Sequence, residues 1–146
     1  MKFRSLFASG FFLAATSFSP IPRAFAGEAI LLIARADAEV AALTAPQAAD
    51  LFLQRGAVSK LIPYDRDDPA LREGFYRAVA DISLTSLRAY WAKQVFTGRA
   101  RPPKSLGGED VSGVLSASPF AVTYVLAGKQ PPGSKVLLKI GPSDSP

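Results

Sequence analysis

The stretch 61–91 constrains the fold most, because it predicts a strand, a charged turn and two helices in immediate succession. A short apolar run ends at Tyr64, and the turn 65–68, Asp-Arg-Asp-Asp, follows it. Asp68 is suited to cap a helix that begins at Pro69, since a carboxylate accepts free backbone N–H groups and proline lacks a donor that would otherwise be unpaired. Where a helix begins directly after a strand, its first backbone N–H groups are free and carry partial positive charge, which favours an anionic ligand.

Apolar spacing predicts the buried faces of these two helices. In the first helix, the apolar residues recur at i, i+4, i+7 and i+8, and they are Leu71, Phe75, Ala78 and Val79. The second helix is expected to begin at about Leu84 with Ser83 as its cap, and its predicted buried residues are Leu84, Leu87, Trp91 and Val95.

The remaining segments extend the alternation of strands and helices. A continuous apolar run at 29–34 is typical of a strand buried on both faces. Thr44 and Gln47 form a capping-box pattern at the start of a helix. The glycines and acids at 107–110 predict a further short helix, 96–105 is expected to be a loop, and the final strands are expected at 120–125 and 135–140. The order predicts an α/β fold, with a mixed sheet of about four strands flanked by about four helices.

Residues 1–26 have the organisation of a secretory signal peptide. Lys2 and Arg4 precede an apolar segment at 6–18, and Ala-Phe-Ala at 24–26 fits a small-residue cleavage site. The apolar segment is shorter than the about 20 residues that a spanning helix needs. We therefore expect a periplasmic or secreted protein without a membrane span after cleavage. Its single domain is predicted at 27–141, with a flexible tail at 142–146.

Composition excludes several classes of function. The whole chain carries a formal charge of +5, but the predicted leader contains Lys2, Arg4 and Arg23 and no acid, so the remainder carries only +2. This excess is too small to predict nucleic-acid binding. The sequence has no histidine and no cysteine, which excludes a Ser-His-Asp triad, thiolate chemistry, disulfides and the usual zinc and iron–sulfur sites. We predict no cofactor and no metal site.

An enzyme would have to use carboxylates. Asp65, Asp67 and Asp68 could in principle provide a general acid and base, as in glycoside hydrolysis. Adjacent acids on a turn are more often helix caps and solvated groups, and a chain this short has little room for a cleft. We therefore predict that the protein is not an enzyme.

Several short motifs follow one another through most of 28–140 in a recognisable order. They are Leu-Thr-x-x-Gln at 43–47, Leu-Phe at 51–52, Gly56, Ile-Pro-Tyr at 62–64, Leu-Arg-x-x-Phe-Tyr at 71–76, Tyr-Trp at 90–91, Phe-Thr-Gly-Arg at 96–99 and Ser-Pro-Phe-Ala-Val-Thr-Tyr-Val at 118–125. In this order and spacing they resemble one lobe of the type 2 periplasmic binding proteins. The most similar members are the phosphate-binding components of ABC importers and their short, single-lobed relatives. The resemblance implies a substrate-binding protein-like (PBP-like) domain with a role in ABC transporter-related transport.

Two departures from the family bear on ligand binding. A two-lobed binding protein closes on its ligand at a hinge, whereas about 120 residues after the leader leave room for one lobe. The family's phosphate site resembles a Ser-Gly-Thr turn, and this chain has Asp-Asp-Pro-Ala at 67–70 instead.

The predicted ligand site combines the helix start with nearby cations. Its residues are Arg66, Asp68, Pro69, Ala70, Leu71 and Arg72, with Arg99 and Arg101 adding positive potential. The alternative is that Asp68 only caps the helix, that Arg66 and Arg72 pair with neighbouring acids, and that the loop carrying Arg99 and Arg101 is a solvated surface.

Two functions follow from these alternatives. The first is an exported, non-catalytic module that binds a small oxyanion such as phosphate, weakly alone or better across a homodimer. The second is an envelope protein–protein adaptor for a transporter or sensor, which keeps the fold without binding a solute.

Overall fold

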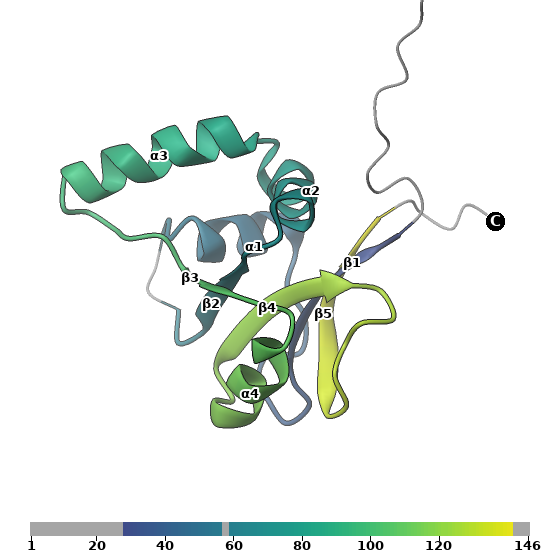
Figure 1. The fold of residues 1–146 in the computed structure, drawn as a ribbon. Coiled ribbons are helices and arrows are strands. Elements are labelled where there is room, and N and C mark those ends of the chain that lie inside the picture. Colours follow the sequence, from purple (N-terminus) through teal and green to yellow (C-terminus); the bar gives the residue numbers. More distant parts are fainter. Residues whose placement is uncertain (1–27, 57–58, 142–146) are drawn as a thin grey trace, which may run out of the picture.

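The computed structural model describes residues 28–56 and 59–141 (Figure 1). The predicted signal peptide at 1–26 and the predicted tail at 142–146 lie outside these ranges. The elements are β1 (Ile30–Arg35), α1 (Ala45–Phe52), β2 (Ile62–Arg66), α2 (Pro69–Ala80), α3 (Leu84–Phe96), β3 (Lys104–Leu106), α4 (Asp110–Ala117), β4 (Ala121–Leu126) and β5 (Ser134–Ile140). None of the helices in the described ranges has the length and apolarity needed to cross a membrane.

The strands form one mixed sheet in the order β3-β2-β4-β1-β5. The strand β1 runs antiparallel to both of its neighbours, β4 and β5, whereas β2 runs parallel to β4 and to β3. In Figure 1, α1, α2 and α3 lie on one side of the sheet and α4 on the other. The predicted α/β fold with a mixed sheet and four helices is confirmed, and the sheet has five strands rather than about four.

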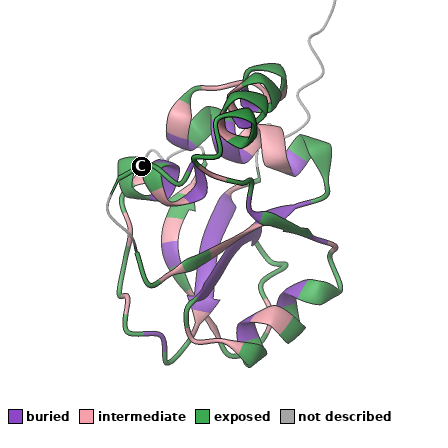
Figure 2. Ribbon diagram, turned by 90° about the vertical axis from the view of Figure 1, so that its left-hand side faces the viewer, coloured by how far each residue is buried: buried purple, intermediate pink, exposed green. Residues whose placement is uncertain are grey.

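Alternation along β1 explains why its sequence is a continuous apolar run. Ile30, Leu32 and Ala34 belong to the core beneath α1, α2 and α3. Leu31 and Ile33 face a smaller core with α4. Each face of the strand is therefore covered, and the buried colouring of the central strands in Figure 2 follows from this.

The larger core is built around four aromatic rings. Phe75 stacks on Tyr124 with ring centroids 3.9 Å apart, and Phe52 meets Phe75 edge-on at 4.8 Å. Tyr76 packs edge-on against Phe75 at 5.4 Å. Phe52, Phe75, Tyr76 and Tyr124 are all fully buried. This cluster joins α1 and α2 to β4, so it fixes where α2 begins relative to the sheet.

The strand that the sequence does not predict is β3, which begins within the predicted loop at 96–105. It has only three residues and pairs in parallel with β2, from Tyr64 with Lys104 to Arg66 with Leu106. A segment this short has no measurable apolar period, and two prolines precede it, so local sequence does not indicate a strand.

The charged turn is shorter than predicted. The strand β2 continues to Arg66, so Asp65 and Arg66 are strand residues and both are buried. The prediction placed the strand end at Tyr64 because charged residues usually leave the core. Here the buried groups have protein partners, described below, which offset the loss of water.

The predicted helix starts are confirmed. Thr44 and Gln47 form a reciprocal capping box at α1, and Ser83 accepts the N–H of Ser86 at α3. Two predicted core positions are wrong. Ala78 of α2 is exposed, and Val95 of α3 is 52% exposed. The last turn of α3 projects past α2 in Figure 1, so Val95 has little to pack against although its helical spacing is correct.

Candidate functional site

The backbone donors at the start of α2 are already occupied. Asp68 Oδ1 accepts the N–H groups of Ala70 at 2.9 Å and Leu71 at 3.1 Å. Pro69, the first helical residue, has no N–H. An anion could bond to these amides only by displacing the Asp68 carboxylate. The Asp68 carboxylate therefore already serves as the anion at the start of α2, and the helix start attracts an anionic ligand only weakly.

The side chain of Arg66 is buried and forms hydrogen bonds within the sheet. Its Nε donates to the carbonyl of Leu106 at 3.3 Å, and its Nη1 donates to the carbonyl of Tyr124 at 3.1 Å. These bonds join the parallel strands on either side of β2. The guanidinium thus links β3 to β4 across β2, so these two donors are used within the sheet.

Asp65 is the polar centre of the fold. It is fully buried and accepts hydrogen bonds from the hydroxyls of Tyr76, at 3.1 Å, and Tyr124. Its carboxylate also accepts the Arg66 backbone N–H at 2.9 Å. Burial, and then the neighbouring Asp65 carboxylate, raise the pKa of Tyr76 and of Tyr124, so both hydroxyls stay protonated and remain donors.

Arg72 connects this buried centre to the surface. Its Nε atom lies 2.9 Å from Oδ2 of Asp65, in an ionic contact whose N–H is not aligned as a hydrogen bond. The side chain is 29% exposed and lines a groove between α2 and α3. Of the six residues predicted at the helix start, Pro69 and Arg72 line the groove, and Arg72 is the charged one of the two.

The groove has a volume of about 630 Å³. Polar lining comes from Arg72 and Asp67 near the start of α2 and from Arg88 on α3. Pro69 also lines it, so the groove opens beside the predicted helix start. Arg88 is exposed and has no ion pair among the described residues. Arg72 is already paired with the buried Asp65, so within the described part of the chain Arg88 provides the unpaired cation of the lining, and the two guanidinium groups together offer N–H donors to an anion with several acceptor atoms.

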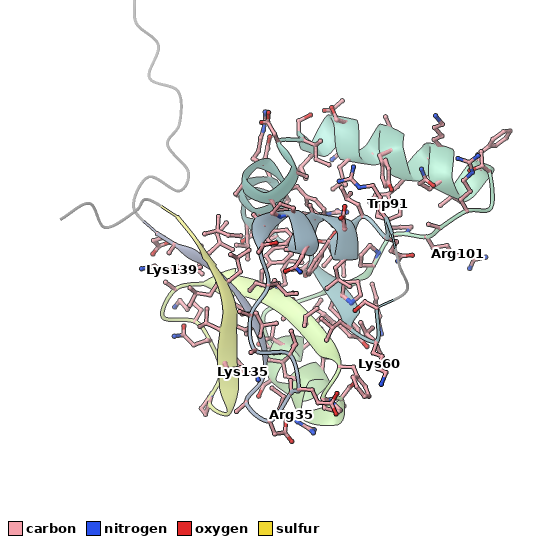
Figure 3. All side chains as sticks on the ribbon, turned by 180° about the vertical axis from the view of Figure 1, so that it is seen from behind. Arg35, Lys60, Trp91, Arg101, Lys135 and Lys139 are labelled. Atoms are coloured by element: carbon pink, nitrogen blue, oxygen red, sulfur yellow. The ribbon has the colours of Figure 1, made fainter. Side chains whose placement is uncertain are left out.

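Arg99 and Arg101 do not line this groove. Both are exposed in the segment between α3 and β3, and Figure 3 shows Arg101 pointing outward. The next residue, Pro102, does line the groove. From 82 to 108 the sequence has five basic residues and no acid. These cations can add positive potential near the groove, but direct contact of Arg99 or Arg101 with its contents would require the segment to move.

Sequence reasoning considered Asp65 as a turn residue and a candidate acid or base, and it missed both the buried role of Asp65 and the α3 wall of the groove. The partners of Asp65 are 11 and 59 residues away along the chain, so only the folded sheet brings them together. Arg88 could have been found, since it is the one cation in the first two turns of α3, one residue after the buried Leu87. Within the described ranges no three potential carboxylate, imidazole or thiolate ligands gather for a metal ion.

Replacing the cap tests whether the amides can serve an external anion. We expect Asp68→Ala to lower the free energy of unfolding by about 1 kcal/mol, and millimolar phosphate to recover part of the loss by taking the freed N–H groups of Ala70 and Leu71. Urea unfolding at constant ionic strength measures both effects. The control is Thr44→Ala, which removes the cap of α1 and should lose stability without any phosphate response. Equal phosphate responses in the two variants would contradict the expectation.

Comparison with known proteins identifies the fold. No family model and no curated protein sequence matches this chain. Its structure is similar to a Clostridium perfringens protein described as a phosphate ABC transporter substrate-binding protein, solved with bound phosphate, with 16% identity and a TM-score of 0.55. It is also similar to an ABC-type phosphate transport receptor from Vibrio cholerae, with 12% identity and a TM-score of 0.56. Each match covers 75% of this chain but only 44% or 45% of the other protein. The predicted binding-protein-like fold is confirmed.

Proposed function

We propose that this chain is a non-catalytic, solute-binding-like module that holds a small oxyanion in the groove between α2 and α3. The observation that carries the proposal is that Arg72, Arg88 and the start of α2 border one open groove. The fold is that of the phosphate-binding structures described above, and those proteins supply the class of ligand. Export to the periplasm or outside the cell, through the predicted signal peptide, is part of the proposal.

Arg72 is the principal ligand residue in this proposal. Its Nε is in ionic contact with Asp65, and the residue also lines the groove, so the remaining N–H groups of the guanidinium are the candidate donors to a ligand. The predicted contacts from Ala70 and Leu71 require Asp68 to give way first, and Arg66 acts only by holding β2 in place. A charge-assisted hydrogen bond contributes about 1.5–3 kcal/mol. Two guanidiniums therefore support a Kd in the millimolar range, which corresponds to about −4 kcal/mol.

The lack of catalytic activity is proposed from the state of the carboxylates. Asp65 is enclosed by its hydrogen-bond and ionic partners, and Asp68 caps α2. Asp67 is the remaining acid of the predicted turn. Its neighbour Asp110 accepts the N–H of Gly107 and does not line the groove, so among the described residues the groove itself holds one carboxylate and no acid–base pair. With no histidine or cysteine in the sequence, no alternative nucleophile–base pair of the common kinds is available.

The short chain points to a second surface opposite the groove. It spans less than half the length of the two phosphate-binding structures it matches. In this proposal an oxyanion lies between α2 and α3, and another protein could cover the side of the groove that is open to solvent. A homodimer or a transporter component could provide this cover and raise the affinity above the millimolar range, because each added charge-assisted bond contributes to holding the anion.

Calorimetric titration with phosphate, sulfate and acetate tests the proposal. We expect a millimolar Kd for at least one of these anions and a two- to fivefold weaker Kd, roughly, in Arg88→Gln, because this change removes one partly solvated charge contact. The matched control is Arg77→Gln. Arg77 is also exposed and helical, but it pairs with Glu73 and does not line the groove. Equal losses in both variants would show that the effect is general electrostatics and not a site.

The adaptor alternative is favoured by two specific observations. The amides that the resemblance assigns to a ligand are taken by Asp68, and α3 ends in the exposed side chains of Val95 and Phe96. An adaptor would give no heat with any of the three anions, and a stable partner would be recovered with the purified chain. Light scattering after size exclusion separates a partner of another kind from a second copy.

A further inference from the structure

The walls of the groove between α2 and α3 are mainly apolar. They include Leu87, Trp91, Val95 and Phe96 on α3, and Pro102 in the segment that follows α3. Phe96 is 93% exposed and Val95 is 52% exposed. A hydrated inorganic anion has no apolar surface, so it would leave these walls in contact with water. An anion with an apolar body would cover them.

Trp91, which lines the same groove, carries a buried hydrogen-bond donor without a partner among the described residues. Its side chain projects from α3 toward the space beneath the helix (Figure 3), and it is 6% exposed. No atom of the described residues accepts a hydrogen bond from its indole Nε1–H. A buried polar group without a partner is destabilising, and such groups in native structures are rare. The nitrogen is shielded from solvent, so an acceptor from a ligand would reach it after the indole turns toward the groove.

The polar groups around these walls favour a negatively charged head group. Arg72 and Arg88 are on opposite sides of the groove, one on α2 and one on α3. Asp67 is the one acid of the lining. The arrangement combines N–H donors with a wide apolar surface, which is the usual composition of a site for an organic molecule.

We propose that the groove binds an organic anion, with a carboxylate or phosphate head near Arg72 and Arg88 and an apolar body against Trp91, Val95 and Phe96. This inference rests on the proposed oxyanion-binding function and names the class of oxyanion. It predicts that the apolar body, and not the charge alone, determines the affinity. Inorganic phosphate would then be a weak ligand that uses the head-group contacts only.

Two pairs of probes test this inference: phenyl phosphate against inorganic phosphate, and 3-phenylpropionate against acetate. We expect the phenyl-bearing member of each pair to bind about tenfold more tightly, which corresponds to removing roughly 60 Å² of apolar surface from water. Trp91 is the only tryptophan of the chain, so its fluorescence reports occupation of the groove directly. The emission should shift with the phenyl-bearing anions at the concentrations at which calorimetry shows binding.

Two variants connect the effect to the groove. Val95→Ser should remove most of the phenyl advantage and leave binding of inorganic phosphate unchanged. Val136→Ser is the matched control, because Val136 is 44% exposed on β5 and does not line the groove. Trp91→Phe keeps an aromatic wall and removes the N–H, so it should weaken both phenyl-bearing anions, as measured by calorimetry.

The outcomes separate this inference from the proposed function. Equal affinity within each pair of probes, with phosphate bound, would overturn the inference and leave oxyanion binding in place. Equal binding of benzyl alcohol and phenyl phosphate would show an apolar site and overturn oxyanion binding. No binding of any probe would overturn both proposals. If light scattering shows a dimer that Phe96→Ser converts to a monomer, a second copy covers the groove and the inference is wrong.

Discussion

Replacing Asp65 by alanine should lower the free energy of unfolding by about 3–5 kcal/mol, because it removes one partner of a buried ionic contact and leaves the other. Arg72 would keep its charge beside the core without its carboxylate. The hydroxyls of Tyr76 and Tyr124 would lose their common acceptor while remaining buried. A loss of this size is a large fraction of the stability of an ordinary domain, about 5–15 kcal/mol. Equilibrium unfolding in urea measures it.

Asp67→Ala is the matched control for this prediction. Asp67 is two residues farther along the chain, carries the same group and is exposed. Its removal should change the free energy of unfolding by no more than about 0.5 kcal/mol. The double variant Asp65→Leu with Arg72→Met should recover part of the loss, since an apolar pair of suitable volume often replaces a buried ion pair without cost. If Asp65→Ala is as mild as Asp67→Ala, the buried carboxylate does not organise the fold.

Phe75→Ala should destabilise the protein by about 3–5 kcal/mol as well, but through loss of packing. Phe75 is fully buried and contacts three other aromatic rings, on α1, α2 and β4. The cavity would open where α2 meets the sheet. Both urea unfolding and near-ultraviolet circular dichroism should report it, because the tyrosines of the cluster would lose their fixed environment.

Phe96→Ala makes the same chemical change at a solvent-facing position. Because Phe96 is 93% exposed, its truncation should alter the free energy of unfolding by no more than about 0.5 kcal/mol. Phe75→Leu should give an intermediate loss, since it keeps part of the volume. A loss in Phe96→Ala as large as that in Phe75→Ala would mean that α3 packs on the domain through its last residue.

The sequence predicts those helices and strands that depend on neighbouring residues, such as a cap or an apolar run. The cap at Asp68 and the capping box at Thr44 depend on a few neighbouring residues, and both are present in the structure. The apolar run of β1 likewise predicts burial on both faces. The three-residue β3 has no such signal, because its extended form depends on pairing with β2.

The candidate site was only partly predictable for the same reason. The helix start and its cap by Asp68 follow from the sequence, but the burial of Arg66 depends on the neighbouring strands. Charge alone suggested Arg99 and Arg101, whereas the groove is lined by Arg72 and Arg88. The difference arises because side-chain direction on α3 is set by its packing on α2, which charge spacing does not reveal.

The position of β1 has a consequence for the order of events during synthesis. This strand lies between β4 and β5, and both of these partners follow it along the chain only after α1, α2, α3 and α4. Until they emerge from the ribosome, both edges of an apolar strand stay open and the aromatic cluster lacks Tyr124. Long-range pairing of this kind slows folding. A nascent chain of this topology therefore cannot complete its sheet until β4 and β5 are available, and its exposed β1 is the segment that a holding chaperone would be expected to bind.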